Sequence, residues 1–179
     1  DDTLKLFPRR KEGLRVLLIH ASIREWSWPN IAPLGQQFVA SAAWCDGHDV
    51  RVLDLNAERG HPVEFDEAFR RWADRRVEWA LDYHEPDVVG ISGIISQYSG
   101  IRRIARLVRM ARPQATIVLG GGIASCLPRF MAERLPVDVV VQEEGEVTIS
   151  EVLARIEAGT GFAGVKGAVY KLPDGQIVE

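Results

Sequence analysis

The chain has 179 residues, of which 46% are hydrophobic and 8% aromatic, with 22 Lys plus Arg against 25 Asp plus Glu. This balance is typical of one soluble, cored domain and excludes disordered and collagen-like chains, while two cysteines exclude a disulfide scaffold and a four-cysteine metal cluster. The net charge of −3 gives no general attraction to nucleic acid or acidic membranes.

Targeting signals are not evident in the sequence. The N-terminus lacks the apolar stretch of a signal peptide, and no window reaches the roughly 18 consecutive apolar residues of a membrane span. We therefore expect a cytoplasmic protein with no membrane partner. Because the chain does not begin with Met, we also expect a fragment or a processed form of a longer protein.

Five short apolar segments rich in β-branched residues recur along the chain. They cover residues 16–19, 50–53, 88–91, 116–119 and 137–141. Because these segments are mostly continuous rather than alternating, they predict strands that are buried on both faces. The gaps between them are long enough for helical crossovers.

The gaps carry helical patterns. An Ala-rich stretch over residues 34–45 ends at Asp46-Gly47, and aromatic residues between Phe65 and Trp79 recur at three- and four-residue spacing. Further helices are predicted over residues 101–111, 128–135 and 146–158.

Strict alternation of strands and helices predicts an α/β fold with a flavodoxin-like (Rossmann-like), doubly wound, five-stranded parallel sheet of strand order 2-1-3-4-5. After Gly159 the pattern changes. Residues 168–171 and 176–178 flank Pro173-Asp174-Gly175 and predict a small β-hairpin. We therefore divide the chain into an α/β domain over residues 1–160 and a C-terminal hairpin segment over residues 161–179.

Ligands of open α/β sheets bind beyond the carboxyl ends of the strands, so the loops that follow the strands are the places to search for a site. After the fourth strand, Gly120-Gly121-Gly122 removes three consecutive side chains and allows a ligand to approach the backbone. A tight turn would need only one or two glycines, so we favour the binding interpretation. Residues 120–125 are not a dinucleotide fingerprint, because they follow the fourth strand and their final position is Ser125.

Two other loops carry candidate residues. After the third strand, Ser92-Gly93-Ile94 and Ser96 offer small and hydroxyl-bearing groups to a polar ligand, although Ser96 would also suit a helix cap. After the fifth strand, Glu143, Glu144 and Glu146 begin a helix, where carboxylates stabilise the helix dipole. An acid–base pair is the alternative, but adjacent residues point in different directions.

Two further groups of residues, one aromatic and one basic, predict contacts with a ligand, with solvent or with another domain. Trp26 and Trp28, in the long loop after the first strand, predict either a lid over a large flat ligand or a surface for another domain. A basic run predicts a solvated helix face or a domain interface rather than a nucleic-acid site, because no aromatic residues are interleaved with it. The run comprises Arg102, Arg103, Arg106, Arg109 and Arg112.

Together these loops resemble the cobalamin-binding domain found at the N-terminus of cobalamin-dependent radical SAM enzymes. Ordered stretches across nearly the whole chain carry the resemblance: residues 16–20, 33–35, 47–54, 86–92, 120–122 and 144–148. Residues 164–175 are similar to the bridge that leads, in that family, into the radical SAM barrel. The barrel's Cys-x-x-x-Cys-x-x-Cys motif is absent, so the [4Fe-4S] cluster and S-adenosylmethionine are expected in the parent enzyme and not on this chain.

The resemblance implies cobalamin as the cofactor. In the wider family the corrin ring rests on the carboxyl edge of the sheet, and the nucleotide tail enters a slot lined by a Ser-x-Leu motif and a Gly-Gly pair. Ser92-Gly93-Ile94 resembles the first motif, with Ile for Leu, and Gly121-Gly122 resembles the second. The residues assigned to the cofactor are Asn56, Ser92, Gly93, Ile94, Ser96, Gly120, Gly121, Gly122, Glu144 and Gly145.

The loop after the second strand departs from the family pattern. Relatives of the mutase and methionine-synthase type carry Asp-x-His-x-x-Gly, whose His ligates cobalt, whereas this chain has Asn56 in that register. A carboxamide is a poor cobalt ligand, so the resemblance implies base-off cobalamin with water or no ligand at the lower face. His61 could ligate cobalt only if the loop folds back, and His20 is expected to be a hydrogen-bonded edge residue.

The expected function is therefore a cobalamin-binding module, not catalytic by itself, that serves a radical SAM domain of the methyltransferase type in cis. Two alternatives share the topology. A phospho-receiver needs a phospho-accepting Asp after the third strand, where this chain has Ser92-Gly93-Ile94. A flavodoxin-like FMN carrier needs a hydroxyl-rich phosphate loop after the first strand, where residues 21–25 supply one hydroxyl and one carboxylate.

Overall fold

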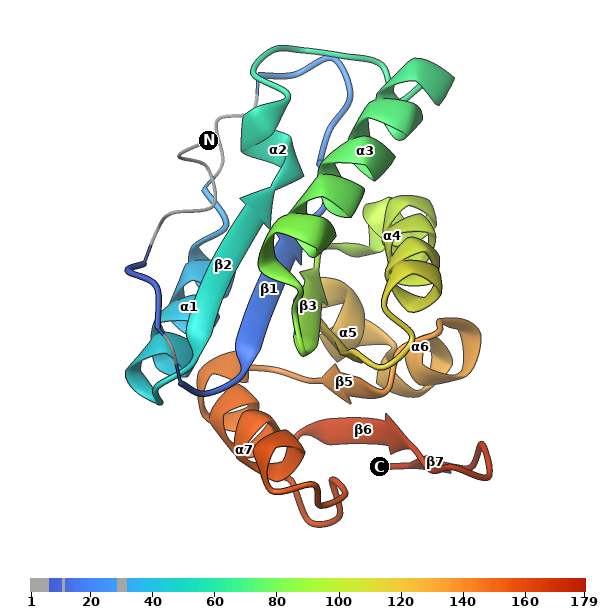
Figure 1. The fold of residues 1–179 in the computed structure, drawn as a ribbon. Coiled ribbons are helices and arrows are strands. Elements are labelled where there is room, and N and C mark those ends of the chain that lie inside the picture. The colour runs from blue at the N-terminus through green and yellow to red at the C-terminus, as the bar shows by residue number, and fades with distance from the viewer. Residues whose placement is uncertain (1–6, 11, 29–31) are drawn as a thin grey trace.

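A computed structural model describes residues 7–10, 12–28 and 32–179 of the chain. Within these residues seven strands form one sheet, in the order β2-β1-β3-β4-β5-β6-β7 (Figure 1). Its parallel part consists of β1 (Arg15–His20), β2 (Asp49–Asp54), β3 (Val88–Ser92), β4 (Thr116–Gly120) and β5 (Val139–Val141). The predicted doubly wound fold and the strand order 2-1-3-4-5 are confirmed.

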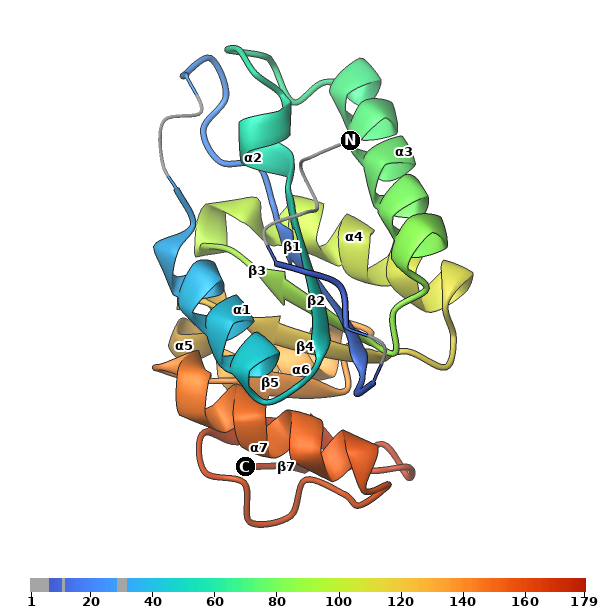
Figure 2. The same ribbon diagram turned by 60° about the vertical axis from the view of Figure 1, so that its left-hand side comes forward.

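Helices cover both faces of the sheet (Figures 1 and 2). One face is covered by α1 (Leu34–Cys45) and α7 (Gly145–Glu157). The other is covered by α3 (Glu67–His84), α4 (Tyr98–Ala111), α5 (Gly122–Cys126) and α6 (Pro128–Arg134). Two short turns, α2 (Leu55–Glu58) and the 3-10 helix η1 (Ile95–Gln97), lie in the loops after β2 and β3. Neither turn is long enough to show a period in the sequence.

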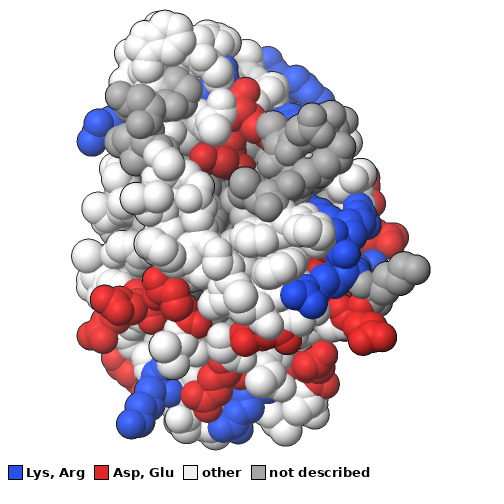
Figure 3. Space-filling view, turned by 90° about the vertical axis from the view of Figure 1, so that its left-hand side faces the viewer, with Lys and Arg blue, Asp and Glu red and all other residues white. Residues whose placement is uncertain are grey.

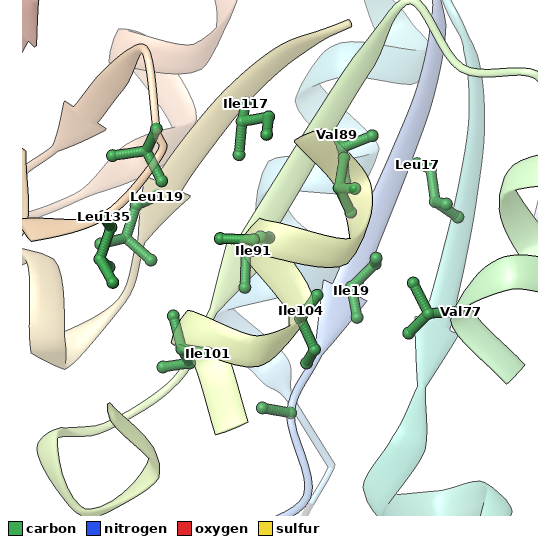
Figure 4. Close-up of a cluster of buried hydrophobic side chains, with 14 of the residues drawn as sticks. Leu17, Ile19, Val77, Val89, Ile91, Ile101, Ile104, Ile117, Leu119 and Leu135 are labelled. Carbon is green, nitrogen blue, oxygen red and sulfur yellow. The ribbon is translucent and has the colours of Figure 1, made fainter. Parts of the chain in front are cut away.

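Alternate strand residues point into two separate cores. Leu17, Ile19 and Val89 pack with residues of α3 and α4, as Figure 4 shows. Val16 and Leu18 point the other way and pack with residues of α1 and α7. Because every central strand is covered on both faces, its sequence is apolar at consecutive positions.

The C-terminal hairpin is part of the main sheet. β6 (Ala168–Lys171) pairs antiparallel with β5, and β7 (Ile177–Val178) pairs antiparallel with β6. The hairpin predicted over residues 168–178 therefore continues the sheet beyond its fifth strand.

The arginines of α4 contact neighbouring elements. Arg103 is 2.6 Å from Asp74 of α3, and Arg109 is 2.6 Å from Asp138, just before β5. Arg112 pairs with Asp82 at 2.8 Å. Three of the five arginines of the basic run thus pair within the fold, while Arg102 and Arg106 are exposed.

A buried charged group lies at the amino ends of the strands, opposite the edge where ligands are expected. Arg51 Nη2 is 3.4 Å from Asp49 Oδ1, and His84 Nε2 is 3.2 Å from the Asp49 carbonyl oxygen. Burial lowers the pKa of His84, although the nearby Asp49 carboxylate acts in the opposite direction. Burial thus favours the neutral form of the His84 imidazole.

Across the described ranges, no helix combines the length and the apolar character needed to cross a bilayer.

Candidate functional site

A cavity of about 490 Å³ opens at the carboxyl edge of the sheet, on the face covered by α1 and α7. Its volume falls within the roughly 300–1,000 Å³ typical of small-molecule sites. The sheet contributes Leu18, His20, Gly90, Ser92, Val118, Gly120 and Val141 to its lining. The cavity therefore lies where the topology of an open α/β sheet predicts a ligand.

Strand register arranges these lining residues in two rows. Gly90 pairs with Leu18 on one side and with Val118 on the other, which forms a deeper row. Ser92 pairs likewise with His20 and Gly120, which forms a row at the edge. Residues two apart in a strand point to the same face, so both rows face the cavity. The cavity thus has an apolar floor below a polar upper ring.

Gly90 keeps the floor of the cavity open. A Cβ at this position would lie 2.5 Å from Leu18 Cδ2, so any side chain there would force the end of Leu18 to move. Glycine inside a strand weakens it, so a close approach is the physical reason for its presence here. Gly90 was missed from the sequence, although a lone glycine inside the apolar run of residues 88–91 marks it.

Helices α1 and α7 form the walls. Gln36 and Val39 line the cavity from α1, and Glu146 and Ile149 line it from α7. A Cβ at Gly145 would lie 3.2 Å from Val39 Cγ2, so Gly145 allows α7 to begin close against α1.

Two polar side chains of the lining lack partners. Gln36 is only 8% exposed, and His20 is largely buried at the end of β1. Neither amide atom of Gln36 and neither ring nitrogen of His20 has a hydrogen-bond partner in the described part of the chain. Burial lowers the pKa of His20, against an opposing effect of Asp54. The expectation that His20 is hydrogen-bonded is wrong, and the residue belongs to the cavity lining.

Close contact between two loops shapes the rim. Gly121 has a φ of 80°, and a Cβ on it would lie 3.0 Å from the Gly93 carbonyl oxygen. The Ile123 amide donates to the same carbonyl at 3.1 Å. Two glycines therefore allow the loops after β3 and β4 to touch.

Gln97 ties a third loop to this rim. Its Nε2 donates to the carbonyl oxygens of Ala21 and Ser22 at 2.6 and 2.8 Å, and its Oε1 accepts from the Ile94 amide at 2.7 Å. The loops after β1 and β3 are thus held together by one buried amide. Sequence reasoning missed Gln97, because its role depends on partners about 75 residues away.

Most of the residues assigned to the ligand lie together at the cavity. The lining includes Ser92, Gly93, Ile94, Gly120, Gly121, Gly122, Glu144 and Gly145. Two assigned residues are not among the lining: Ser96 is exposed on η1, and Asn56 is buried below the loop after β1. Nor does Ser96 cap α4, whose N-cap residue is Gln97.

Asn56 and Arg59 hold the loop after β1. Asn56 Oδ1 accepts from the Ile23 amide and from Arg59 Nε, both at 3.3 Å. Arg59 Nη2 donates to the carbonyl oxygens of Ile23, Arg24 and Ser27, each at 3.0 Å. His61, two residues further along, is exposed and does not line the cavity.

The loop after β1 presents aromatic surface. Trp26 is 68% exposed and Trp28 is 66% exposed, while residues 29–31 of the same loop lie outside the described ranges. Leu34 and Phe38 of α1 are also exposed. Figure 3 shows the side of the molecule on which α1 lies: uncharged side chains fill its centre, and acidic side chains gather below them.

The chain is similar to a known protein family and to several known proteins. The model of the B12 binding domain matches residues 29–153. A cytidylyl-2-hydroxyethylphosphonate methyltransferase of Streptomyces wedmorensis is 27% identical over 179 residues, or 95% of this chain and 34% of that protein. An uncharacterized methyltransferase of Pyrococcus horikoshii is 28% identical over 140 residues, or 78% of this chain and 28% of that protein. The chain thus spans about a third of these relatives' length.

Solved structures with the same fold include two radical S-adenosylmethionine enzymes. The methyltransferase TsrM from Kitasatospora setae, with cobalamin and a [4Fe-4S] cluster bound, has a TM-score of 0.74 and 23% identity, covering 92% of this chain and 28% of that one. The cobalamin-dependent enzyme OxsB, with aqua-cobalamin bound, has a TM-score of 0.75 and 19% identity, covering 93% and 22%. At these identities the likeness shows the fold.

Proposed function

The chain belongs to the B12-binding domain family, and from this premise we propose that it holds cobalamin at the carboxyl edge of its sheet. One observation carries the proposal. The bare position of Gly90 leaves an apolar slot between the sheet, α1 and α7, open toward the edge row of His20, Ser92 and Gly120.

The residues present fit this cofactor. The apolar floor suits the flat base at the end of the nucleotide tail. Side chains at Gly90 and Gly121 would be crowded, because their Cβ atoms would lie 2.5 Å from Leu18 Cδ2 and 3.0 Å from the Gly93 carbonyl oxygen. Gln36 and His20 belong to the lining and carry buried polar atoms that lack partners among the described residues, and a turn of either side chain would offer these atoms to a ligand in the slot. At its mouth, the carboxylates of Glu143, Glu144 and Glu146 can accept hydrogen bonds from the amide side chains on the edge of a corrin ring.

We infer further that the cofactor is bound base-off. A base inserted in the slot cannot also reach cobalt. The Asn56 amide oxygen is occupied by two donors, and His61 is exposed away from the cavity. These positions favour water or no ligand at the lower face.

The chain's own residues bind, orient and shield the cofactor. Gln97 and Arg59 fix the loops around the slot, and α1 and α7 exclude water from its floor.

Bound cobalamin supplies a cobalt centre that can carry a methyl group. We propose that this centre serves a radical SAM domain of the methyltransferase type in cis, with residues 161–179 as the bridge toward it. The methyltransferase names of the relatives support this proposal.

Reconstitution tests the binding proposal. The protein is incubated with hydroxocobalamin, passed through gel filtration and examined by visible absorption, with FMN as the control ligand. We expect the corrin chromophore to co-elute and FMN to be lost. A colourless protein peak would count against the proposal.

Electron paramagnetic resonance of the reduced cob(II)alamin form tests the base-off state. We expect no splitting from an axial nitrogen, and the same spectrum in His61→Ala. Splitting that disappears in His61→Ala would identify that imidazole as a ligand and overturn the base-off assignment.

The cis partner is tested by sequencing the gene beyond the codon for Glu179, where a Cys-x-x-x-Cys-x-x-Cys motif is expected.

A further inference from the structure

We propose that Gln36 and His20 bind the sugar of the nucleotide tail, above the apolar floor that receives the base. This inference rests on the proposed function and assigns to the slot two polar residues that the sequence motifs do not include.

Gln36 lies in the first turn of α1 on its buried face, which it shares with Ala40 and Ala43. It is 8% exposed, and both atoms of its amide group lack partners within the described residues. A buried polar group without a hydrogen bond costs about 1–3 kcal/mol. Without a ligand to bind, an apolar residue of similar size would suit this buried face of α1 better. The amide is therefore explained by a partner that a ligand supplies.

His20 lies at the end of β1, where it pairs with Ser92. Its two ring nitrogens are shielded from solvent and have no partner in the part of the chain that the structure describes. A neutral imidazole carries one donor and one acceptor. Together with the Gln36 amide and the Ser92 hydroxyl, it gives the upper ring of the slot several neutral donors and acceptors.

The charges around the slot favour a sugar rather than a phosphate. Among the described residues, the lining holds no Lys or Arg and holds three carboxylates, Glu143, Glu144 and Glu146. A phosphate held inside the slot would lack a cation to pair with, so the phosphate that joins this sugar to the corrin side must stay in solvent at the open edge. Ribose hydroxyls are neutral and both donate and accept, which matches Gln36 and His20.

The strand register also places His20 and Ser92 at the depth that the sugar would occupy. His20 and Ser92 are one row above Leu18, Gly90 and Val118, toward the edge of the sheet. A tail that enters from the edge with its base deepest must present its sugar at the level of the upper row. The arrangement thus separates apolar recognition of the base from polar recognition of the sugar.

Binding of two corrinoids to matched variants tests the inference. Gln36→Leu and His20→Leu remove the proposed contacts, and Gln37→Leu and His61→Leu are controls outside the cavity lining. Affinities for aquacobalamin and for cobinamide, which lacks the nucleotide tail, are measured by equilibrium dialysis with corrin absorbance. Each test variant is expected to bind aquacobalamin about tenfold more weakly and cobinamide unchanged. The control variants are expected to bind both ligands like the parent protein.

Thermal unfolding without ligand separates binding from folding. Removing an unpaired buried amide should leave the Tm of Gln36→Leu equal to or above that of the parent. Unchanged aquacobalamin affinity in both test variants would overturn the inference, as would an equal loss for cobinamide. A changed visible spectrum in His20→Leu would place the imidazole on cobalt and also overturn it. A parent protein that binds neither corrinoid contradicts the proposed function instead.

Discussion

Leu18 Cδ2 lies 2.5 Å from the point that a Cβ at residue 90 would occupy. The two residues pair across β1 and β3, and Leu18 covers the space that the missing side chain leaves. The floor of the cavity is therefore built by one leucine and one glycine together. Any side chain at position 90 must displace Leu18 or fill the slot.

Gly90→Ala is expected to weaken cobalamin binding about tenfold or more, because the displaced Leu18 side chain moves into the cavity. The free energy of unfolding should fall by no more than about 1 kcal/mol, since the cavity can absorb the displaced atoms. Equilibrium dialysis and urea unfolding measure the two effects. Restored binding in Gly90→Ala combined with Leu18→Ala would confirm the cause.

Gly100→Ala in α4 is the matched control, since a Cβ there meets nothing within 4 Å. It should raise the free energy of unfolding by about 0.5–1 kcal/mol and leave affinity unchanged. Equal affinities in Gly90→Ala and Gly100→Ala would contradict the assignment of the slot.

Gly121→Ala is expected to reduce the free energy of unfolding by about 2 kcal/mol, because the new side chain combines a left-handed backbone with a contact to the Gly93 carbonyl. In Gly122→Ala the Cβ would meet only Ile94 Cγ2, at 3.8 Å, so a change within about 0.5 kcal/mol is expected. Urea unfolding of the two variants provides the comparison. Equal losses would show that the turn is not limited by Gly121.

Arg59→Met is expected to destabilise the protein by about 2–3 kcal/mol, because three carbonyl oxygens lose a charged donor. The loop after β1 should open locally, so amide hydrogen exchange at Ile23 and Trp26 should accelerate. Arg106→Met, on the exposed face of α4, should change stability by less than about 0.5 kcal/mol. Unaltered exchange at Ile23 and Trp26 in Arg59→Met would show that Arg59 does not hold the loop.

Stability is expected to fall as the pH drops below 6.5. Burial lowers the pKa of His84 and of His20 below the ordinary value of 6.5, so the unfolded chain binds protons in this range before the folded protein does. The stabilisation is complete above pH 6.5 and is lost as the pH falls through the lowered pKa values. Urea unfolding of His84→Gln between pH 5 and 7.5 should show a weaker pH dependence than the parent protein.

The carboxylate of Asp87 contributes to the pH dependence of stability at a lower pH than His84 does. Burial raises the pKa of Asp87, but hydrogen bonds and charge from Arg15 outweigh this effect and leave it below 3.8. The stability that Asp87 contributes is present above pH 3.8 and lost below it.

An identical dependence of stability on pH in His84→Gln and in the parent protein between pH 5 and 6.5 would show that His84 is not the group responsible.

The fold was predictable because burial on both faces leaves a strong pattern in the sequence. The continuous apolar runs at residues 16–19 and 88–91 mark central strands, and the helical patterns between them determine the crossovers. The glycine run after β4 was equally informative, because glycine removes side chains wherever it occurs. Such signals are local and need no knowledge of distant partners.

The parts of the site that were missed depend on distant partners. Gly90 matters because Leu18 lies beside it, and Gln97 matters because it contacts Ala21 and Ser22 across the sheet edge. In the sequence, Gln36 is one polar residue within a predicted Ala-rich helix. Its unpaired amide becomes visible only when the surrounding atoms are in place.

The slot interrupts the smaller core, since Leu18, Val118, Val141 and Ile149 belong both to that core and to the cavity lining. A base that enters the slot would cover apolar atoms that protein side chains cover elsewhere along the same layer. Calorimetry of association should then report a negative heat-capacity change. Release through the open edge would return these apolar atoms to water, and the lost contact should slow dissociation of the ligand.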